Sequence, residues 1–314
     1  MLVALAGGVG AARLLRGLVT VVAPGDVTVV VNTGDDMVLH GLHISPDVDT
    51  IVYTLAGLDN RTTGWGVTTE SWTVMTELDR LGGQTWFRLG DRDLATHLYR
   101  TQRLAEGAPL HQVTAELARA RGLHVRILPM SDDPVRTHLV LAGDGQLAPG
   151  TEVSFQHYFV GLRHDVAVRA VRFDGAPAAR PAPGVLEAIR EAGVVVACPS
   201  NPLVSIGPLL AVPGVRDALI ARREQVVAVS PIVAGAALKG PADRLLTELG
   251  HESSVVGVAR LHAPWAGTLV IDEKDAHLRG AVEAEGMRCV VAPTIMTSPD
   301  VAAALSTVVL DAAR

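Results

Sequence analysis

The residues best suited to chemistry lie in three polar loops near the start of the chain. Residues 7–10 read Gly-Gly-Val-Gly, residues 32–36 read Asn-Thr-Gly-Asp-Asp, and residues 45–50 read Ser-Pro-Asp-Val-Asp-Thr. Glycines between a strand and a helix let backbone amides approach a phosphate closely. Carboxylates supply the oxygen ligands that Mg²⁺ prefers beside phosphate oxygens and water. The loops therefore predict one site for a phosphorylated ligand and a divalent cation.

The second and third loops bring four carboxylates together: Asp35, Asp36, Asp47 and Asp49. At one edge of a sheet these acids would repel one another without a cation, so we expect two of them to bind the metal. The alternative is that they are solvated loop acids or, for Asp47, a helix cap. The glycine loop matches neither the full dinucleotide fingerprint nor a Walker loop, and a simple tight turn would also explain it.

Three further segments could contact an anionic ligand. Arg88 lies beside two aromatic residues, which suits an anionic or planar heteroaromatic ligand, although a surface ion-pair network has the same composition. Ser200 and Asn201 stand between two prolines after a buried strand and could face a ligand or only form the turn. Lys239 follows the next strand end and could meet a phosphate as a point charge. No serine has nucleophile-elbow spacing, so covalent catalysis is not supported.

The elements that position these residues are those of a doubly wound α/β sheet. Residues 2–6 and 27–31 are continuous apolar runs, typical of parallel strands buried on both faces, and a helix pattern over 11–22 separates them. Strand and helix alternation resumes after the Pro/Ala-rich segment 177–184. We expect further strands at 194–198, 226–230, 254–259, 269–272 and 288–292, and helices at 49–56, 185–191, from 208, near 241–249 and from 300.

The middle of the chain follows a different pattern, mostly helical over 68–122 and strand-rich over 125–173. We therefore expect one domain over residues 1–314 with a Rossmann-like, doubly wound, mostly parallel sheet. Its core would come from about 1–66 and 185–314, and a helical and strand-rich insertion would cover about 67–184.

Composition excludes several classes of protein. The chain has 314 residues, of which 48% are hydrophobic, and a formal charge of −6 without a basic run, so nucleic acid is not an expected partner. No segment approaches the roughly 18 uninterrupted apolar residues of a membrane span, and the N-terminus lacks the basic region of a signal peptide. Cys198 and Cys289 fit buried free thiols. We expect a cytoplasmic protein.

Several segments resemble the 2-phospho-L-lactate transferase family (CofD-like, including its mycobacterial FbiA type), in the family's order and over essentially the whole chain. The matching segments are AGGVGAARLLRGL at 6–18, NTGDD at 32–36, GLHISPDVDTIVYTLAG at 41–57, GWG at 64–66, TWFRLGDRDLATHLYRT at 85–101, LPMSDDPVRT at 128–137, CPSNPLVSIGPLLAVPG at 198–214 and VAVSPIVAGAALKGPA at 227–242.

The resemblance implies a Mg²⁺-dependent transferase of coenzyme F-420 biosynthesis, and it leads us to expect a homodimer. Such an enzyme moves a 2-phospholactyl or phosphoenolpyruvyl group from a guanosine diphospho-type donor to the deazaflavin alcohol Fo and releases GMP. The resemblance also implies that Asp49 and Arg88 contact Fo and that Asp35 and Asp36 bind the metal, and we expect Asp49 or Asp47 to take the hydroxyl proton. The residues expected to face the donor are Gly7, Gly8, Val9, Gly10, Ser200, Asn201 and Lys239.

Two other interpretations remain. A non-catalytic, nucleotide-sugar-binding regulator of the YvcK-like group would share the glycine-rich start and the aspartate pair, but segments 86–91 and 199–202 argue against it. A nicotinamide oxidoreductase is weakly supported because the dinucleotide fingerprint is incomplete. The sequence leaves the choice between lactyl and enolpyruvyl groups open, because one bond order changes little in a pocket.

Overall fold

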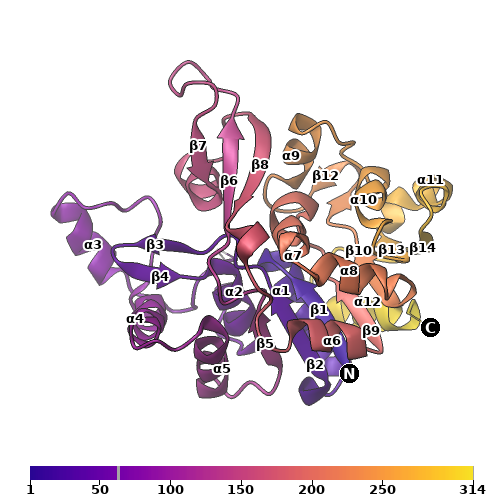
Figure 1. Ribbon diagram of the computed structural model, residues 1–314, viewed down its shortest axis with the longest axis horizontal. Helices are drawn as coiled ribbons and strands as arrows, with labels where there is room; N and C mark the ends of the chain where they lie inside the picture. Colours follow the sequence, from indigo (N-terminus) through magenta and orange to yellow (C-terminus); the bar gives the residue numbers. More distant parts are fainter. Residues whose placement is uncertain (62–63, 314) are drawn as a thin grey trace.

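The central sheet has seven parallel strands in the order β14-β13-β10-β9-β1-β2-β5 (Figure 1). The computed structural model describes residues 1–61 and 64–313. Every residue of β1, β2, β10 and β13 is buried, as the continuous apolar runs predict for parallel strands covered on both faces. The strands are β1 Leu2–Ala6, β2 Val27–Val31, β5 Arg126–Pro129, β9 Val194–Ala197, β10 Val226–Val229, β13 Thr268–Ile271 and β14 Arg288–Val291.

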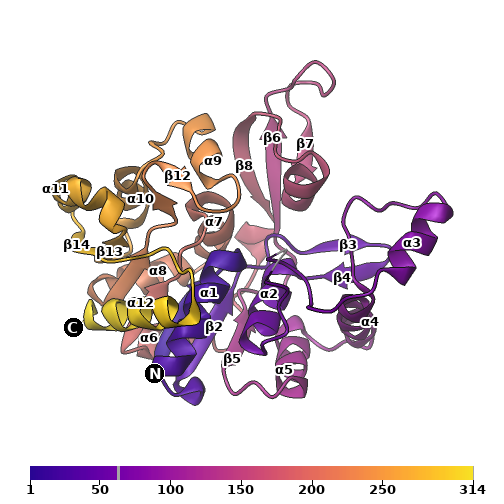
Figure 2. The same ribbon diagram turned by 180° about the vertical axis from the view of Figure 1, so that it is seen from behind.

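Helices cover both faces of the sheet and bury an apolar core on each face. Successive side chains of β1 point alternately into the two cores. Leu2 and Ala4 pack under α1, α2 and α12, whereas Val3 and Leu5 face α6, α7, α8 and α10. Helices α1 and α12 lie side by side on one face (Figure 2). The bounds are α1 Gly8–Val21, α2 Pro46–Leu55, α6 Val185–Glu191, α7 Gly207–Ala211, α8 Val215–Ile220, α9 Ala242–Glu248, α10 Val255–His262, α11 Arg279–Ala284 and α12 Pro299–Asp311.

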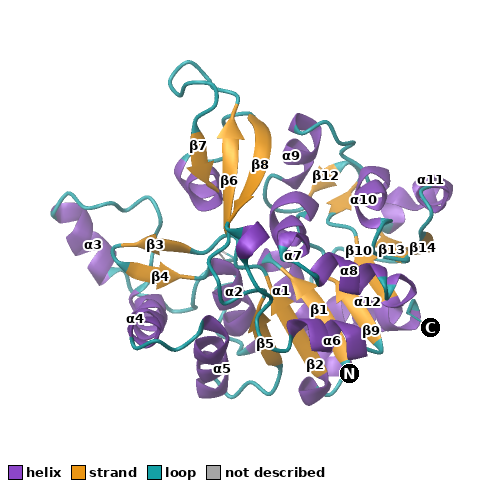
Figure 3. Ribbon diagram, viewed as in Figure 1, coloured by secondary structure: helices purple, strands orange, loops and turns teal. Residues whose placement is uncertain are grey.

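Two lobes project from the strand ends (Figure 3). One contains a β-hairpin and helices around a small apolar cluster that includes Leu39 and Leu89. The other is a three-stranded antiparallel sheet with a π-helical turn between its second and third strands in chain order. The first lobe and the helix beside it comprise β3 Met37–Leu39, β4 Leu42–Ile44, α3 Thr73–Arg80, α4 Asp91–Ala105 and α5 Leu110–Ala120. The second comprises β6 Arg136–Leu141, β7 Glu152–Ser154, η2 His157–Gly161 and β8 Val168–Asp174. The short η4 Pro202–Ile206, β11 Ile232–Val233 and β12 Ala236–Ala237 follow later.

The strand order places a topological switch point between β1 and β9. The chain forms β2 and then β5 on one side of β1. It then returns to form β9 on the other side of β1 and continues away from β1 through β10, β13 and β14. Ligands of such sheets bind in the crevice beyond the strands' carboxyl ends at this point. The predicted α/β, doubly wound, mostly parallel sheet is confirmed.

Several predicted boundaries were wrong. Strand β5 belongs to the central sheet, so the range 67–184 is not wholly an insertion. Residues 254–259 were expected to form a strand, but Ser254 caps α10 by accepting bonds from the amides of Val256 and Gly257. A short apolar run cannot by itself distinguish a buried strand from a buried helix. Helices α1 and α2 also begin three residues earlier than predicted, at Gly8 and Pro46.

Cys198 and Cys289 are buried free thiols, as predicted. Over residues 1–61 and 64–313, no helix combines the length and apolar character needed to cross a membrane.

Candidate active site

A cleft of about 620 Å³ opens beyond the carboxyl ends of β1 and β9, at the switch point. Its walls come from the start of α1, the loops after β2, β9 and β10, the segment before α4 and the π-helical turn η2. Most of the predicted site residues line it: Gly7, Gly8, Val9, Gly10, Asp35, Asp47, Arg88, Ser200, Asn201 and Lys239. Asp36 and Asp49 are not among the lining residues.

The glycine segment is the first turn of α1. Gly7 is the N-cap and provides no side-chain cap, and the amide of Gly8 bonds to Asp47, so the amides of Val9 and Gly10 are available to an anion at the start of a 14-residue helix. A Cβ atom on Gly10 would lie 2.3 Å from the carbonyl oxygen of Pro199, so only glycine allows the first turn of α1 and the loop after β9 to approach this closely. The close approach brings the helix start and the turn after β9 to one side of the cleft.

The polar residues after β9, Ser200 and Asn201, stabilise this wall through hydrogen bonds to backbone groups. The Ser200 hydroxyl donates to the Gly7 carbonyl at 2.9 Å and accepts from the Gly7 amide at 3.3 Å, which ties β9 to the glycine turn. Asn201 Oδ1 accepts from the amides of Leu203 and Val204. Both residues line the cleft, but these bonds already use the Ser200 hydroxyl and Asn201 Oδ1.

Asp35 and Asp47 face the cleft, and Asn32 links the two loops that carry them. Asn32 is fully buried, donates to Asp47 Oδ2 at 2.9 Å and accepts from the amide of Gly34 at 2.8 Å. Burial raises the pKa of Asp35 well above its ordinary value, and the Asp47 charge raises it further. Burial also raises the pKa of Asp47 to about 6, although Asn32 and the amide of Gly8 oppose that shift. Neither carboxylate has a salt-bridge partner among the described residues.

The loop after β2 also contains buried oxygen atoms without a hydrogen-bond partner. They are Thr33 Oγ1, Asp35 Oδ1 and Asp36 Oδ1. The other Asp36 oxygen accepts from the Ser45 hydroxyl at 2.8 Å, and burial raises the pKa of Asp36 to about 7 despite the charge of Arg136. Buried acceptors without donors are costly, and a cation is the partner that such oxygens fit. These residues therefore fit a metal ion, with Asp35 on the cleft surface and Asp36 behind it.

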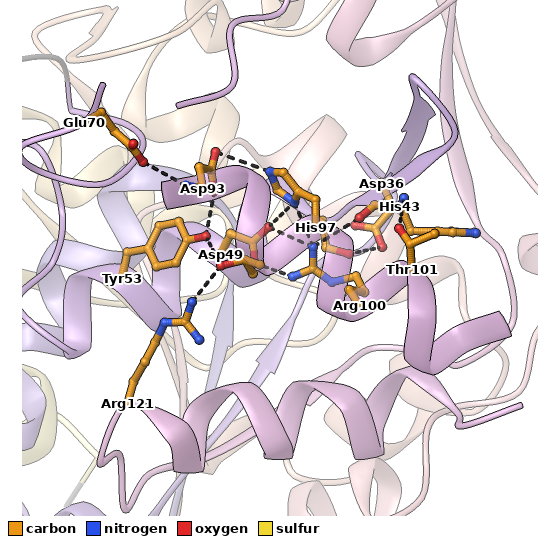
Figure 4. Close-up of polar contacts among 12 residues, drawn as sticks. Asp36, His43, Asp49, Tyr53, Glu70, Asp93, His97, Arg100, Thr101 and Arg121 are labelled. Carbon is orange, nitrogen blue, oxygen red and sulfur yellow. Dashed lines mark hydrogen bonds and ion pairs between the residues drawn. The ribbon is translucent and has the colours of Figure 1, made fainter. Parts of the chain in front are cut away.

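Asp49 belongs to a buried network that also includes the neighbouring Asp36 (Figure 4). Both of its oxygens bond to the guanidinium of the fully buried Arg100, and His97 Nδ1 lies 3.7 Å from Asp49 Oδ2. The Tyr53 hydroxyl donates to Asp93 Oδ1 at 2.6 Å on the far side of His97. Because Asp49 does not line the cleft and both of its oxygens bond to Arg100, its contact with Fo and its role in taking the proton stay predictions.

The same network contains a group with metal-ligand spacing. Asp49, Asp93 and His97 each offer an atom within 4.8 Å of the others. Arg100 Nη1, however, lies 3.2 Å from His97 Nδ1 and shares its positive charge with Asp49. The guanidinium already supplies the cation, so we interpret this cluster as a structural ion-pair network.

The opposite wall of the cleft is aromatic. It presents Trp86 and Phe87 from the segment before α4, and Phe155 and Phe159 from the π-helical region. The two phenylalanine rings stack with centroids 5.6 Å apart and an interplanar angle of 5°. The guanidinium of Arg88 lies 4.4 Å from the ring centroid of Trp72, outside this group. Flat apolar surfaces beside a cation suit a planar heteroaromatic ligand.

Sequence patterns did not predict that several residues of the cleft belong to the site. Phe155 and Phe159 lie about seventy positions from Trp86, and only the fold brings them to the same cleft. Arg13 and Asn32 belong to the matching segments at 6–18 and 32–36, but their positions alone did not separate them from ordinary helix and turn residues.

Comparisons with known proteins identify the family of the chain. The family model described as 2-phospho-L-lactate transferase CofD matches residues 2–295. A protein named phosphoenolpyruvate transferase from Streptomyces griseus is 47% identical over 317 residues, covering 100% of this chain and 98% of its own length. Proteins of the same name from Thermobifida fusca and Mycolicibacterium smegmatis are 43% and 41% identical, covering 99% and 98% of this chain and 97% of each relative.

A solved structure has a similar fold at much lower sequence identity. It is a member of the upf0052 family from Bacillus halodurans, with a TM-score of 0.61 and 16% identity over 98% of both chains. At this identity the likeness concerns the fold alone.

Proposed function

Because the chain belongs to the 2-phospho-L-lactate transferase CofD family, we propose that it is a transferase of coenzyme F-420 biosynthesis. The proposed reaction moves a three-carbon phosphoryl group from a guanosine diphospho-type donor to the deazaflavin alcohol Fo and releases GMP. The names of the curated relatives favour phosphoenolpyruvyl over 2-phospholactyl as that group. One observation supports the proposal most strongly: a helix start suited to phosphates, unpaired carboxylates and an aromatic wall share one cleft.

The donor diphosphate would lie against the start of α1. The amides of Gly8, Val9 and Gly10 are at a helix N-terminus, where backbone dipoles favour negative charge. Lys239 lines the same cleft and has no acidic partner among the described residues, so it is available to a phosphoryl oxygen.

The loop after β2 would hold Mg²⁺ through Asp35 and Asp36. The proposal is supported by the buried, unpartnered oxygens of this loop. Among the described residues, only the Arg100-paired group brings three ligand atoms within 4.8 Å, and an incomplete set of carboxylates suits an ion that keeps waters and phosphate oxygens. When bound, Mg²⁺ would neutralise charge on the diphosphate.

The deazaflavin ring of Fo would lie against Trp86, Phe155 and Phe159, with Arg88 at the edge of that wall. The primary hydroxyl of its ribityl chain attacks the phosphorus that carries the three-carbon group. A new P–O bond forms as the bond to the bridging oxygen breaks, and GMP leaves with that oxygen. Such reactions depend mainly on positioning and on neutralised charge.

We assign the hydroxyl proton to Asp47 rather than to Asp49. Asp47 lines the cleft beside Gly8, and its pKa of about 6 suits a base near neutral pH. Asp49 is held by Arg100 behind the cleft wall. Asn32 keeps the Asp47 carboxylate in place through its 2.9 Å hydrogen bond.

The test is a mass-spectrometric assay with the purified protein, Fo, Mg²⁺ and the lactyl and enolpyruvyl donors in separate reactions. We expect GMP and a three-carbon phosphoryl adduct of Fo. A nucleotide-sugar-binding regulator would bind without releasing GMP, and that result would refute the transfer reaction. The homodimer remains a proposal that sedimentation analysis would test.

Arg88→Met tests the acceptor side of the cleft. Because Arg88 lines the cleft directly after Trp86 and Phe87 of the aromatic wall, we expect Fo affinity to fall far more than donor affinity. Arg80→Met on the exposed surface of α3 is the matched control, since Arg80 does not line the cleft. Equal loss of both affinities in Arg88→Met would contradict the role given to Arg88.

A further inference from the structure

We infer that Arg13 and Lys239 form a second anion subsite beside the glycine turn, and that Arg13 binds the carboxylate of the donor's three-carbon group. The inference rests on the proposed function and names a specificity residue for its donor. Arg13 lies in the matching segment at 6–18 but is not among the predicted site residues.

Arg13 lies where two cavities meet. A second cavity, of about 240 Å³, runs along α1 and shares Val9, Arg13, Gly64 and Trp65 with the main cleft. A ligand group that extends from the glycine turn toward this second cavity would pass the Arg13 side chain. The second cavity offers room for a short branch of the donor.

The two arginines on this face of α1 differ in their partners. Arg16 is neutralised by Asp59 and also donates to the carbonyl of Thr54. Arg13, three residues earlier, is exposed in the cleft and makes no hydrogen bond or ion pair within the described part of the chain. The positive charge of Arg13 is therefore available to a ligand, whereas that of Arg16 is used to hold the loop after α2.

Lys239 reaches the same point from the other side of the cleft. A Cβ atom on Gly64 would lie 2.3 Å from Lys239 Nζ, so a residue without a side chain leaves space for the ammonium group. Partial burial lowers the pKa of Lys239, and the nearby charge of Arg13 lowers it further. Two cations that repel each other without a carboxylate between them would be stabilised by an anion.

The chemistry of the donor suggests which anion each cation binds. The start of α1 and the loop after β2 already face the diphosphate, so the donor's remaining charge is the carboxylate of its three-carbon group. A guanidinium offers paired N–H donors that match a carboxylate, whereas an ammonium group meets a phosphoryl oxygen as a point charge. We therefore assign the carboxylate to Arg13 and a phosphoryl oxygen to Lys239.

The test changes Arg13 in the protein and the carboxylate in the ligand, one at a time and together. Affinities are measured by titration calorimetry without Fo. The probes are guanosine diphospho-lactate and its carboxamide, which differ only in that charge. Arg13→Met should weaken binding of the carboxylate probe about tenfold to a hundredfold, the usual range for a hydrogen bond to a charged group, and leave the carboxamide nearly unaffected. Arg13→Lys should recover part of the loss, and Lys239→Met should weaken both probes alike.

Parallel loss of both probes in Arg13→Met, or no loss of either, would overturn the assignment. Arg13 is exposed, so an unchanged melting temperature should show that the variant folds normally. The assignment of the subsite and the proposed transfer reaction can fail independently of each other. A wild-type protein that favours the carboxylate probe but releases no GMP with Fo would refute the transfer reaction and retain the subsite, whereas turnover with equal affinity for both probes would refute only the subsite.

Discussion

The buried ion pair between Arg100 and Asp49 connects the hairpin lobe to the start of α2. The Arg100 side chain is fully buried and the Asp49 side chain is 7% exposed. Arg100→Met removes both bonds to Asp49 and leaves that carboxylate with His97 as its nearest basic group. Stranding one charge of a buried pair costs about 3–5 kcal/mol, so we expect a loss of unfolding free energy of that size.

The companion variants test whether the loss comes from the unpaired charge. Asp49→Leu should cost a similar amount because it leaves the guanidinium without its acid. Arg100→Met combined with Asp49→Leu should recover most of the loss, since apolar pairs often replace buried ion pairs at little cost. Urea unfolding at pH 7.5, followed by circular dichroism, gives the free energies and their coupling. Simple addition of the two single losses would refute the explanation.

The same three variants address the predicted contact between Asp49 and Fo. If Asp49 acts only by holding α2 in place, Fo affinity should return with stability in the double variant. If the stable double variant still fails to bind Fo, the direct contact implied by the family resemblance would be supported. We expect recovery, because Arg100 occupies both carboxylate oxygens and Asp49 does not line the cleft.

Three further predictions concern single residues. Asn32→Leu removes the hydrogen bond that holds Asp47, the proposed base, so the rate of GMP release should fall about tenfold or more; an unchanged rate would exclude that role. Burial lowers the pKa of His262 from 6.5 to about 4, so the unfolded chain binds a proton that the fold excludes. The unfolding free energy should therefore drop by about 3 kcal/mol as pH falls from 6.5 to below 4, and His262→Phe should flatten this part of the profile in urea titrations. Gly10→Ala would place a methyl group 2.3 Å from the Pro199 carbonyl oxygen, and we expect about 1–3 kcal/mol of destabilisation together with weaker donor binding; wild-type stability would contradict the close approach.

Local sequence was sufficient for the parts of the fold that depend on short-range patterns. Continuous apolar runs identified β1, β2, β9, β10, β13 and β14 because strands covered on both faces need no polar alternation. The same signal failed at residues 254–259, where α10 is apolar on nearly every side. It also gave no means of assigning β5 to the central sheet, because pairing with β2 depends on contacts across about a hundred residues.

The sequence by itself determined the family, the sheet class and most of the residues that line the cleft, because these follow from motifs and from strand ends. Only the tertiary structure decided which carboxylates face a ligand. Asp47 and Asp49 are two residues apart on the first turn of α2, where successive side chains point in different directions. One therefore faces the glycine turn, and the other faces Arg100 from a distant helix. That division depends on packing between elements, which the order of residues in one segment does not specify.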